Sequence, residues 1–213
     1  MAKALANANR PQATPLEVFK LARKKWLESK RISIGDLANE VGVSRVTLYR
    51  WVGSKEHLIE EILWSFAKPT YENAVKETPG NGVEHFVGVQ RRFLNDLATF
   101  EPMRRFVHEN PTVAVRIQTK DAQSAHSRII DLLTKHLIQQ ASAGHLRLPM
   151  PAARMAEMII FTNGALLYSA LVGGRDPRPA IEQACIITRL LLQGEFQELA
   201  PAAVRSSKKK PND

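Results

Sequence analysis

The segment 43–52 brings together side chains that can form hydrogen bonds and apolar contacts with DNA. Arginine forms bidentate hydrogen bonds with guanine, hydroxyl groups donate to phosphate oxygens, and aromatic or methyl groups contact thymine methyls. In one short helix, Val52 and either Val46 or Leu48 are expected to face a core. The other side chains of that helix then lie outside. The first candidates for contacts in a major groove are therefore Arg45, Thr47, Tyr49, Arg50 and Trp51.

Two short helices with capping signals are expected to position these side chains. Ser33 stands three residues before an acid, and the apolar stripe that follows ends at Gly42. Ser44 begins the next helix, which ends at Gly53. A turn that needs positive φ and an N-cap separates the two, so 33–53 is predicted to form a helix-turn-helix.

The order of residues along the second helix ranks the candidate DNA contacts. Such a helix is inserted by its N-terminal residues, so Arg45 is ranked above Arg50 as a contact to bases. Ser33 and Lys55 lie at helix N-termini, where backbone N–H groups and the helix dipole favour phosphate. Ser44, which begins the helix, completes the predicted contacts.

A basic helix is expected before the helix-turn-helix. The segment 14–17 combines a capping threonine, a proline at the first helical position and a glutamate three residues after the cap. The preceding segment 1–13 has no periodic apolar pattern and is predicted to be a flexible arm. Whether this arm enters the minor groove stays open.

The positive charge is concentrated at the two ends of the chain. The formal net charge is +9. Residues 1–70 contain 12 Lys/Arg and 7 Asp/Glu, 71–200 contain 14 and 13, and 201–213 contain 4 and 1. This distribution favours a nucleic-acid-binding region joined to a neutral domain, with 200–213 as a disordered basic tail. On charge alone, a solvated basic face with a disordered end is an equally good interpretation.

Helical apolar periodicity continues to the C-terminus, without the alternation of a strand. A helix beginning at Ser54 runs through Phe66, and Pro69 is expected to end or kink it. The clearest linker is 78–82. Further helices are predicted at 83–100, after Pro102, and at 112–141, 152–172 and 179–199.

The predicted fold class is all-α with two domains. A three-helix DNA-binding domain is assigned to 14–66, and a helical ligand-binding and dimerisation domain to 67–199. The last two helices, 152–172 and 179–199, are apolar on more than one face, which predicts that they bury a second face against a symmetric copy.

The helix-turn-helix resembles the DNA-binding domain of the TetR family of one-component repressors. The resemblance lies in Ile34-x-x-Leu37-Ala38-x-x-Val41-Gly42-Val43-Ser44-x-x-Thr47-Leu48-Tyr49-Arg50, followed by Ser54-Lys55-Glu56-x-Leu58. It implies an all-α homodimer that binds a palindromic operator as a repressor and is released by a small effector. It also adds Val46 to the DNA-contacting residues and implies a phosphate contact for Lys55.

The motif departs from the usual family pattern at two places. Trp51-Val52-Gly53 replaces the common His-Phe or Tyr-Phe, and 30–33 lacks the common glycine and threonine. The variant 49–55, with Leu63-Trp64 after it, is similar to a QsdR-like subgroup that regulates quorum-signal lactone degradation. This resemblance implies a lactone effector, either a γ-butyrolactone or an acyl-homoserine lactone product.

Candidate effector contacts are polar groups or large apolar groups on apolar stripes. A lone histidine on an apolar stripe, such as His126, is more commonly a core residue whose hydrogen bonds are satisfied within the protein. For Asn163, the leading alternative is a hydrogen bond between helices or between protomers. The aromatic and methionine side chains are equally compatible with a plain core. The candidate ligand-binding residues are Phe93, Met103, Phe106, His126, Met158, Phe161, Thr162 and Asn163.

Composition and motifs argue against an enzyme. The single cysteine, Cys185, excludes an internal disulfide and a cysteine-based zinc site. There is no Gly-x-Ser-x-Gly, the segment 80–85 lacks the third glycine of a dinucleotide loop, and His108-Glu109 lacks the second histidine of a zinc-protease helix. We therefore expect no catalysis, no cofactor and no metal.

The sequence gives no sign of secretion or of a membrane partner. The N-terminus has no apolar run of signal-peptide length, and the stretch 158–172 is shorter than the roughly 20 residues of a membrane-spanning helix. We expect a cytoplasmic, nucleoid-associated protein. The alternative function is a nonspecific or architectural DNA-binding protein without an inducer.

Overall fold

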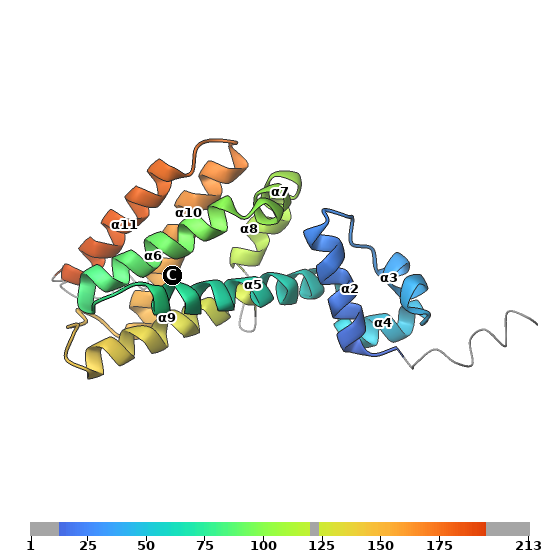
Figure 1. Cartoon of the computed structure of the whole chain (residues 1–213), viewed down its shortest axis with the longest axis horizontal. Coiled ribbons are helices and arrows are strands. Elements are labelled where there is room, and N and C mark those ends of the chain that lie inside the picture. Colours follow the sequence, from blue (N-terminus) through green and yellow to red (C-terminus); the bar gives the residue numbers. More distant parts are fainter. Residues whose placement is uncertain (1–12, 120–123, 195–213) are drawn as a thin grey trace, which may run out of the picture.

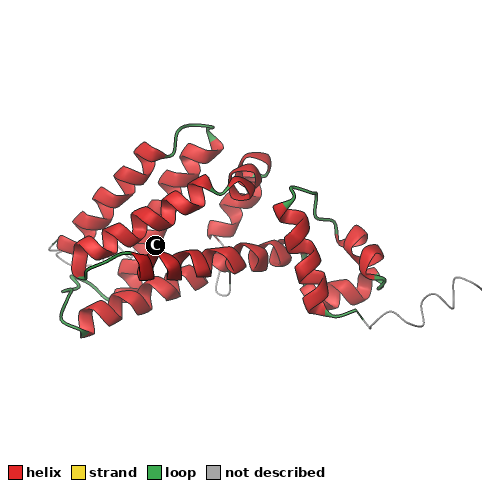
Figure 2. Cartoon of the chain, viewed as in Figure 1, coloured by secondary structure: helices red, strands yellow, loops and turns green. Residues whose placement is uncertain are grey.

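The computed structural model describes residues 13–119 and 124–194, and its regular structure there is entirely helical (Figure 2). This confirms the predicted all-α fold with an N-terminal helix-turn-helix and a C-terminal helical domain. The helices are α2 (Pro15–Leu27), α3 (Ile34–Val41), α4 (Arg45–Val52), α5 (Lys55–Glu77), α6 (Gly82–Thr99), α7 (Glu101–Glu109), α8 (Pro111–Thr119), α9 (Ala125–Ser142), α10 (Ala152–Val172) and α11 (Arg178–Gln193).

The N-terminal helices form a small unit at one end of α5 (Figure 1). Helix α2 begins with the predicted capping box, in which the Thr14 and Glu17 side chains each accept a hydrogen bond from the other residue's backbone N–H. Its buried face consists of Val18, Ala22 and Trp26. Apolar residues of α3, α4 and α5 complete this core.

Helix α5 connects the two parts of the molecule without a break. It runs for 23 residues, about 35 Å at 1.5 Å per residue, from the N-terminal unit into the C-terminal helices (Figure 1). The expectation that Pro69 could end this helix is wrong, because the helix continues to Glu77. Pro69 is exposed, so its ring lies on the solvent side of α5. The domain boundary proposed between 66 and 67 lies inside the helix.

The C-terminal helices pack in layers around α10. Helix α10 lies against α9 and α11, while α6 lies between α5 and α11 (Figure 1). By length and composition, α10 is apolar enough to cross a membrane. Residues along its length, including Met155, Ile159 and Leu167, are buried against neighbouring helices. Packing therefore explains its composition as that of a core helix.

Two helix boundaries differ from the sequence-based expectation. The single helix expected over 112–141 is replaced by α8 and α9, with Ser124 as a new N-cap that accepts a hydrogen bond from the Ser127 N–H at 3.1 Å. This capping bond favours a helix start over continuation, a competition that apolar periodicity alone does not reveal. Helix α11 ends at Gln193, earlier than the predicted end at 199, because Gly194 has an extended backbone. Residues 195–199 of that prediction, the arm up to residue 12 and the basic tail lie outside the described residues.

An aromatic cluster joins the N-terminal unit to the C-terminal helices. Trp26 of α2 stacks on Phe66 of α5 with ring centroids 5.4 Å apart, and it also contacts Phe100 and Phe106, at 5.9 and 6.2 Å. The Arg23 guanidinium lies 4.2 Å from the centre of the Phe66 ring. One apolar core therefore extends across the junction, and the two parts are expected to move together rather than as independent domains.

A buried polar chain crosses the C-terminal core. The Tyr71 hydroxyl and His136 Nδ1 are 2.9 Å apart, and His136 Nε2 lies 3.3 Å from His85 Nε2. Both histidines are buried, and Phe86 stacks on the His136 ring at 4.7 Å. Burial, with a smaller contribution from the nearby His85, lowers the pKa of His136 to about 4. Burial also raises the pKa of Tyr71, so both groups are neutral at neutral pH.

The depressed pKa of His136 predicts acid-sensitive stability. The unfolded chain gains this proton near pH 6.5, whereas the folded chain gains it only near pH 4. The contribution of neutral His136 to the free energy of unfolding is therefore complete above pH 6.5. It is lost as the pH falls toward 4, by at most about 1.4 kcal/mol per pH unit. Urea unfolding at pH 7.5, 6.5 and 5.5 measures it. His136→Gln should flatten the slope and exposed His145→Gln should not; parallel slopes for both would contradict the assignment.

Candidate DNA-binding surface and effector cavity

The turn between α3 and α4 is built by a glycine and a capping serine. Gly42 has φ of 80°, in the left-handed region that favours glycine, and its N–H and that of Val43 both donate to the Ala38 carbonyl. The Ser44 hydroxyl then accepts a hydrogen bond from the Thr47 N–H at 3.0 Å. These bonds fix where α4 begins and how it leaves α3.

Helix α4 presents the predicted DNA-contacting side chains on its outer face. Leu48 and Val52 are buried, so of the two alternatives it is Leu48, and not Val46, that faces the core. Val46 is 79% exposed and Tyr49 is 51% exposed. Arg45 and Arg50 are exposed and Thr47 is half-buried.

Three of the predicted contact residues also have structural roles. Trp51 is half-buried and packs against the core, so only part of its ring faces outward. The Ser33 and Ser44 hydroxyls accept capping hydrogen bonds from the Asp36 and Thr47 N–H groups. These two serines therefore hold the N-termini of α3 and α4 in place.

The cations on this surface differ in their ion pairing. Lys25 pairs with Glu40, and Lys30 pairs with Glu28. None of the ion pairs between described residues involves Arg45, Arg50 or Lys55. Unpaired cations keep their charge available for an anionic partner, because no carboxylate neutralises them.

An apolar cavity lies between α5, α6, α9 and α10, with Met103 of α7 also in its wall. Its free volume is about 110 Å³. The four predicted ligand residues that line it are Phe93, Met103, His126 and Asn163. Burial lowers the pKa of His126, which favours its neutral form. The cavity therefore offers a neutral, largely apolar environment.

The other four predicted ligand residues lie outside this cavity. Phe106 belongs to the aromatic cluster at the junction with α2. Phe161 is 61% exposed, and Met158 and Thr162 are half-buried on α10 without lining the cavity. Met158, Phe161 and Thr162 share α10 with Asn163, but an apolar helix has several faces, and only one face of α10 meets the cavity.

A chain of buried amide and hydroxyl groups runs along one wall of the cavity. The Thr188 hydroxyl donates to Asn163 Oδ1 at 3.5 Å, and Asn163 Nδ2 donates to Gln90 Oε1 at 3.2 Å. All three side chains are buried. The interpretation of Asn163 as a hydrogen bond between helices therefore agrees with the geometry, and Asn163 also lines the cavity.

Comparison with known families identifies the C-terminal helices. Residues 81–193 match the family described as "Tetracyclin repressor-like, C-terminal domain". The chain belongs to the TetR family. TetR-family regulators are DNA-binding transcription regulators rather than enzymes, and this membership confirms the prediction that the protein is not an enzyme. A comparison with curated protein sequences finds no match.

Solved TetR-family structures share this fold. The repressor QsdR of R. erythropolis has a TM-score of 0.78 at 24% identity, over 87% of this chain and 97% of QsdR. Thermus thermophilus FadR, solved with lauroyl-CoA, has a TM-score of 0.63 at 18% identity, over 89% of this chain and 98% of FadR. The repressor AlkX of a Dietzia strain, implicated in biodegradation of n-alkanes, has a TM-score of 0.54 at 19% identity, over 85% of this chain and 97% of AlkX. At these identities, the likeness establishes the fold alone.

Sequence reasoning missed most of the cavity wall. Gln90 could have been found, because it lies between Val89 and Phe93 on the apolar stripe of α6 and thus predicts a buried amide. The apolar members carry no such signal, since cavity-lining and core side chains have the same composition. The missed residues include Leu63, Ala67, Gln90, Leu97, Ile129 and Tyr168.

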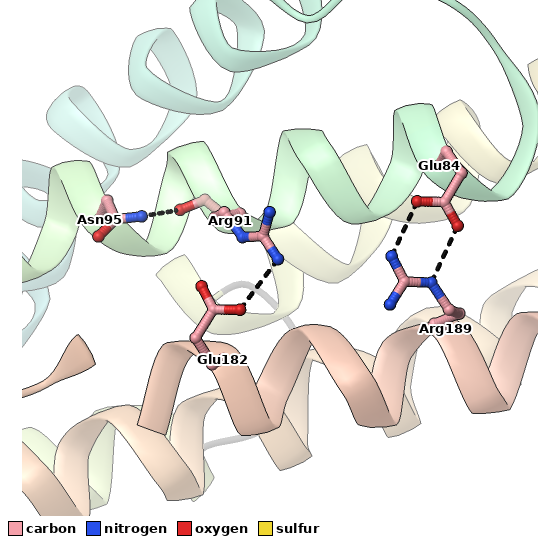
Figure 3. Close-up of polar contacts among 5 residues, drawn as sticks. All are labelled: Glu84, Arg91, Asn95, Glu182 and Arg189. Atoms are coloured by element: carbon pink, nitrogen blue, oxygen red, sulfur yellow. Dashed lines mark hydrogen bonds and ion pairs between the residues drawn. The ribbon is translucent and has the colours of Figure 1, made fainter. Parts of the chain in front are cut away.

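Two ion pairs connect α6 to α11 near the part of the cavity wall that contains Gln90 (Figure 3). Arg189 donates to both carboxylate oxygens of Glu84, at 2.9 and 2.8 Å, and Arg91 donates to Glu182 at 3.0 Å. Gln90 and Thr188 are the chain neighbours of Arg91 and Arg189. The pairs are exposed and contribute little to stability, but they fix the register between the two helices.

The capping role of Ser44 predicts a graded effect of substitution. Ser44→Ala removes the acceptor for the Thr47 N–H and should lower the free energy of unfolding by about 1 kcal/mol. Ser44→Gly should cost only a few tenths of that amount, because glycine is itself tolerated at an N-cap. Urea unfolding of the two variants measures the difference. A larger loss for glycine than for alanine would contradict the capping role.

Proposed function

We propose that this TetR-family protein is a ligand-responsive repressor that binds a palindromic operator as a homodimer and is released by a small lactone. The observation that supports this function is that α5 belongs both to the core beneath the helix-turn-helix and to the wall of the apolar cavity. A ligand in the cavity therefore contacts the same helix that supports the DNA-binding surface.

In the proposed complex, α4 lies in the major groove. Arg45, in its first turn, contacts base edges, and Val46, Thr47 and Tyr49 contact thymine methyls and phosphates. Arg50 and Trp51 lie further along the helix and contact the backbone. Lys55 and the helix termini capped by Ser33 and Ser44 hold phosphates. The exposure of Arg45, Val46 and Tyr49 supports these roles.

The proposed dimer uses the outer faces of α10 and α11. Phe161 on α10 is 61% exposed, and Ile186 and Leu190 on α11 are 52% and 62% exposed. Large apolar side chains in such a patch favour burial against another surface. A twofold pairing would set two copies of α4 about 34 to 36 Å apart, the repeat of a palindromic operator.

The effector class rests on the resemblance of 49–55 and on the neutral, apolar cavity. A cavity of 110 Å³ is comparable to one of about 150 Å³ that holds benzene, so it suits a ring of about six heavy atoms. A γ-butyrolactone ring has that size. An acyl tail needs more room, so a longer lactone would favour a conformer in which the surrounding helices have moved apart.

The proposed mechanism is a shift between two conformers. Arg128 of α9 forms hydrogen bonds with Glu61 of α5 at 2.7 and 3.3 Å, and its guanidinium lies 4.8 Å from the centre of the Trp64 ring. Through this contact, α9 displaced by a ligand would shift α5 with it. Operator affinity then falls by the difference in the ligand's affinity for the two conformers.

The alternative remains a nonspecific or architectural DNA-binding protein. Nonspecific binding depends mainly on phosphates and is steeply salt-dependent, whereas a sequence-specific repressor keeps its preference at fixed salt. The deciding experiment is a mobility shift on DNA upstream of the protein's own gene, at fixed salt, with and without γ-lactones and acyl-homoserine lactones. Specific binding that a lactone releases supports the proposal, and binding without sequence preference favours the alternative.

The proposed roles of Arg45 and Lys55 predict different losses. Arg45→Ala should weaken binding to the operator by roughly 10- to 100-fold and relax the preference at one base pair. Lys55→Ala should weaken all sequences about equally and reduce the salt dependence by about one phosphate contact. Competition assays at several salt concentrations measure both effects. Equal losses on specific and nonspecific DNA for both variants would refute these roles.

The proposed interface predicts which exposed apolar residue controls assembly. Leu190→Glu places a charge in the α11 patch and should convert the dimer to monomer, because a charge is costly to bury unpaired. Ile138→Glu is the matched control, since Ile138 is 50% exposed on α9, a helix that the proposed interface does not use. Light scattering gives the mass of each variant. A Leu190→Glu variant that stays dimeric, or an Ile138→Glu variant that dissociates, would contradict the proposed interface.

A further inference from the structure

We propose that Gln90 selects the effector by donating a hydrogen bond from Nε2 to an acceptor oxygen of a neutral, largely apolar ligand. The proposal assigns to one side chain the recognition of the ligand's polar group. It rests on the proposed function, because it takes the cavity between α5, α6, α9 and α10 as the effector site.

The directions of the hydrogen bonds among Thr188, Asn163 and Gln90 leave one N–H donor of Gln90 without a partner. Thr188 donates to Asn163, and Asn163 donates through Nδ2 to Gln90 Oε1. The acceptor of the Gln90 amide is thus occupied, and its Nε2 has no hydrogen-bond partner among the described residues. Gln90 is 0% exposed and lines the cavity. The free donor is therefore a buried group at the wall of the proposed effector site.

Such a donor favours a ligand that carries an acceptor. A buried N–H without a partner costs free energy, and buried polar groups in folded proteins are nearly always hydrogen-bonded. A carbonyl oxygen in the cavity would remove that cost. A hydrocarbon of the same shape would fill the space but leave the amide unsatisfied, so the site distinguishes ligands by their polar atom.

The remaining wall restricts the charge of the ligand. Among the described residues that line the cavity there is no lysine, arginine, aspartate or glutamate. His126 is present, but burial lowers its pKa, so it is neutral at neutral pH. A carboxylate or ammonium group would enter without a counter-charge, which is costly in an apolar environment. The chemical class is thus a neutral ester, lactone or ketone with an apolar body.

The same hydrogen-bond chain links the ligand to α11. Gln90 contacts Asn163 of α10, which contacts Thr188 of α11, and Arg189 beside Thr188 is paired with Glu84 of α6 (Figure 3). A ligand that draws the Gln90 amide toward itself changes the geometry of the bond to Asn163. The relative position of α6, α10 and α11 is therefore sensitive to the polar atom of the ligand.

The test compares γ-butyrolactone with methylenecyclopentane, a hydrocarbon of nearly the same shape. Each is a five-membered ring of about six heavy atoms, the size that suits the cavity, but only the lactone has oxygen atoms that can accept a hydrogen bond. Because the hydrocarbon gains more free energy from leaving water, the readout is the change of each affinity on substitution, measured by calorimetry. Gln90→Leu should weaken binding of the lactone about 10-fold and leave binding of the hydrocarbon nearly unchanged. Gln139→Leu, at an exposed glutamine of α9, is the matched control and should retain the wild-type preference.

Each outcome separates this inference from the function on which it rests. An equal change of both affinities in Gln90→Leu overturns the role of Gln90 while the effector site stands. Failure of both ligands to bind the wild-type chain overturns the proposed lactone site and this inference together. If Gln90→Leu fails to fold, Gln90→Met replaces it, because methionine has a similar size and no N–H donor.

Discussion

The continuity of α5 is the constraint on which the rest of this structure depends. Leu58 and Ile62 of this helix belong to the core beneath the helix-turn-helix, Leu63 lines the cavity, and Tyr71 lies in the second apolar cluster. The core beneath the helix-turn-helix and the wall of the cavity thus share one helix, and the stacking of Trp26 on Phe66 ties them further. A displacement of α5 at the cavity is therefore expected to reach the helix-turn-helix.

Polar groups in the C-terminal core are arranged in two separate chains. The chain of Tyr71, His136 and His85 is distinct from the chain of Gln90, Asn163 and Thr188 that borders the cavity. In a low-dielectric interior, each chain favours the helix arrangement that satisfies the most partners. The two chains therefore help to specify how α5, α6, α9, α10 and α11 pack against one another.

Much of the fold could be predicted because its signals are local. The Thr14 capping box, the turn glycine Gly42 and the N-cap Ser44 each depend on neighbours within a few residues, and all three formed as expected. The start of α9 at Ser124 was missed, since capping there competes with an apolar stripe that continues on both sides. Of the two effects expected of Pro69, an end to the helix is wrong, because buried residues before and after the proline, such as Leu63 and Tyr71, hold α5 together past its missing N–H.

The cavity was only partly predictable, for a different reason. Which face of α10 meets the cavity depends on the packing of α5, α6 and α9, and no pattern within α10 encodes it. Asn163 was found because a buried amide is unusual in an apolar helix, whereas Phe161 and Phe106 were indistinguishable from cavity residues by composition. The outward face of α4 was easier, since one buried leucine, Leu48, sets the orientation of the whole helix.

Under the proposed mechanism, a ligand in the cavity changes the distance between the two α4 helices of the dimer. A spin label at Asn39→Cys reports that spacing directly, because residue 39 is exposed on α3 and the single native cysteine, Cys185, is buried. Pulsed electron resonance on the dimer should give one interspin distance without ligand and a different one at saturating lactone. An unchanged distance under conditions where the lactone releases the operator would contradict the account.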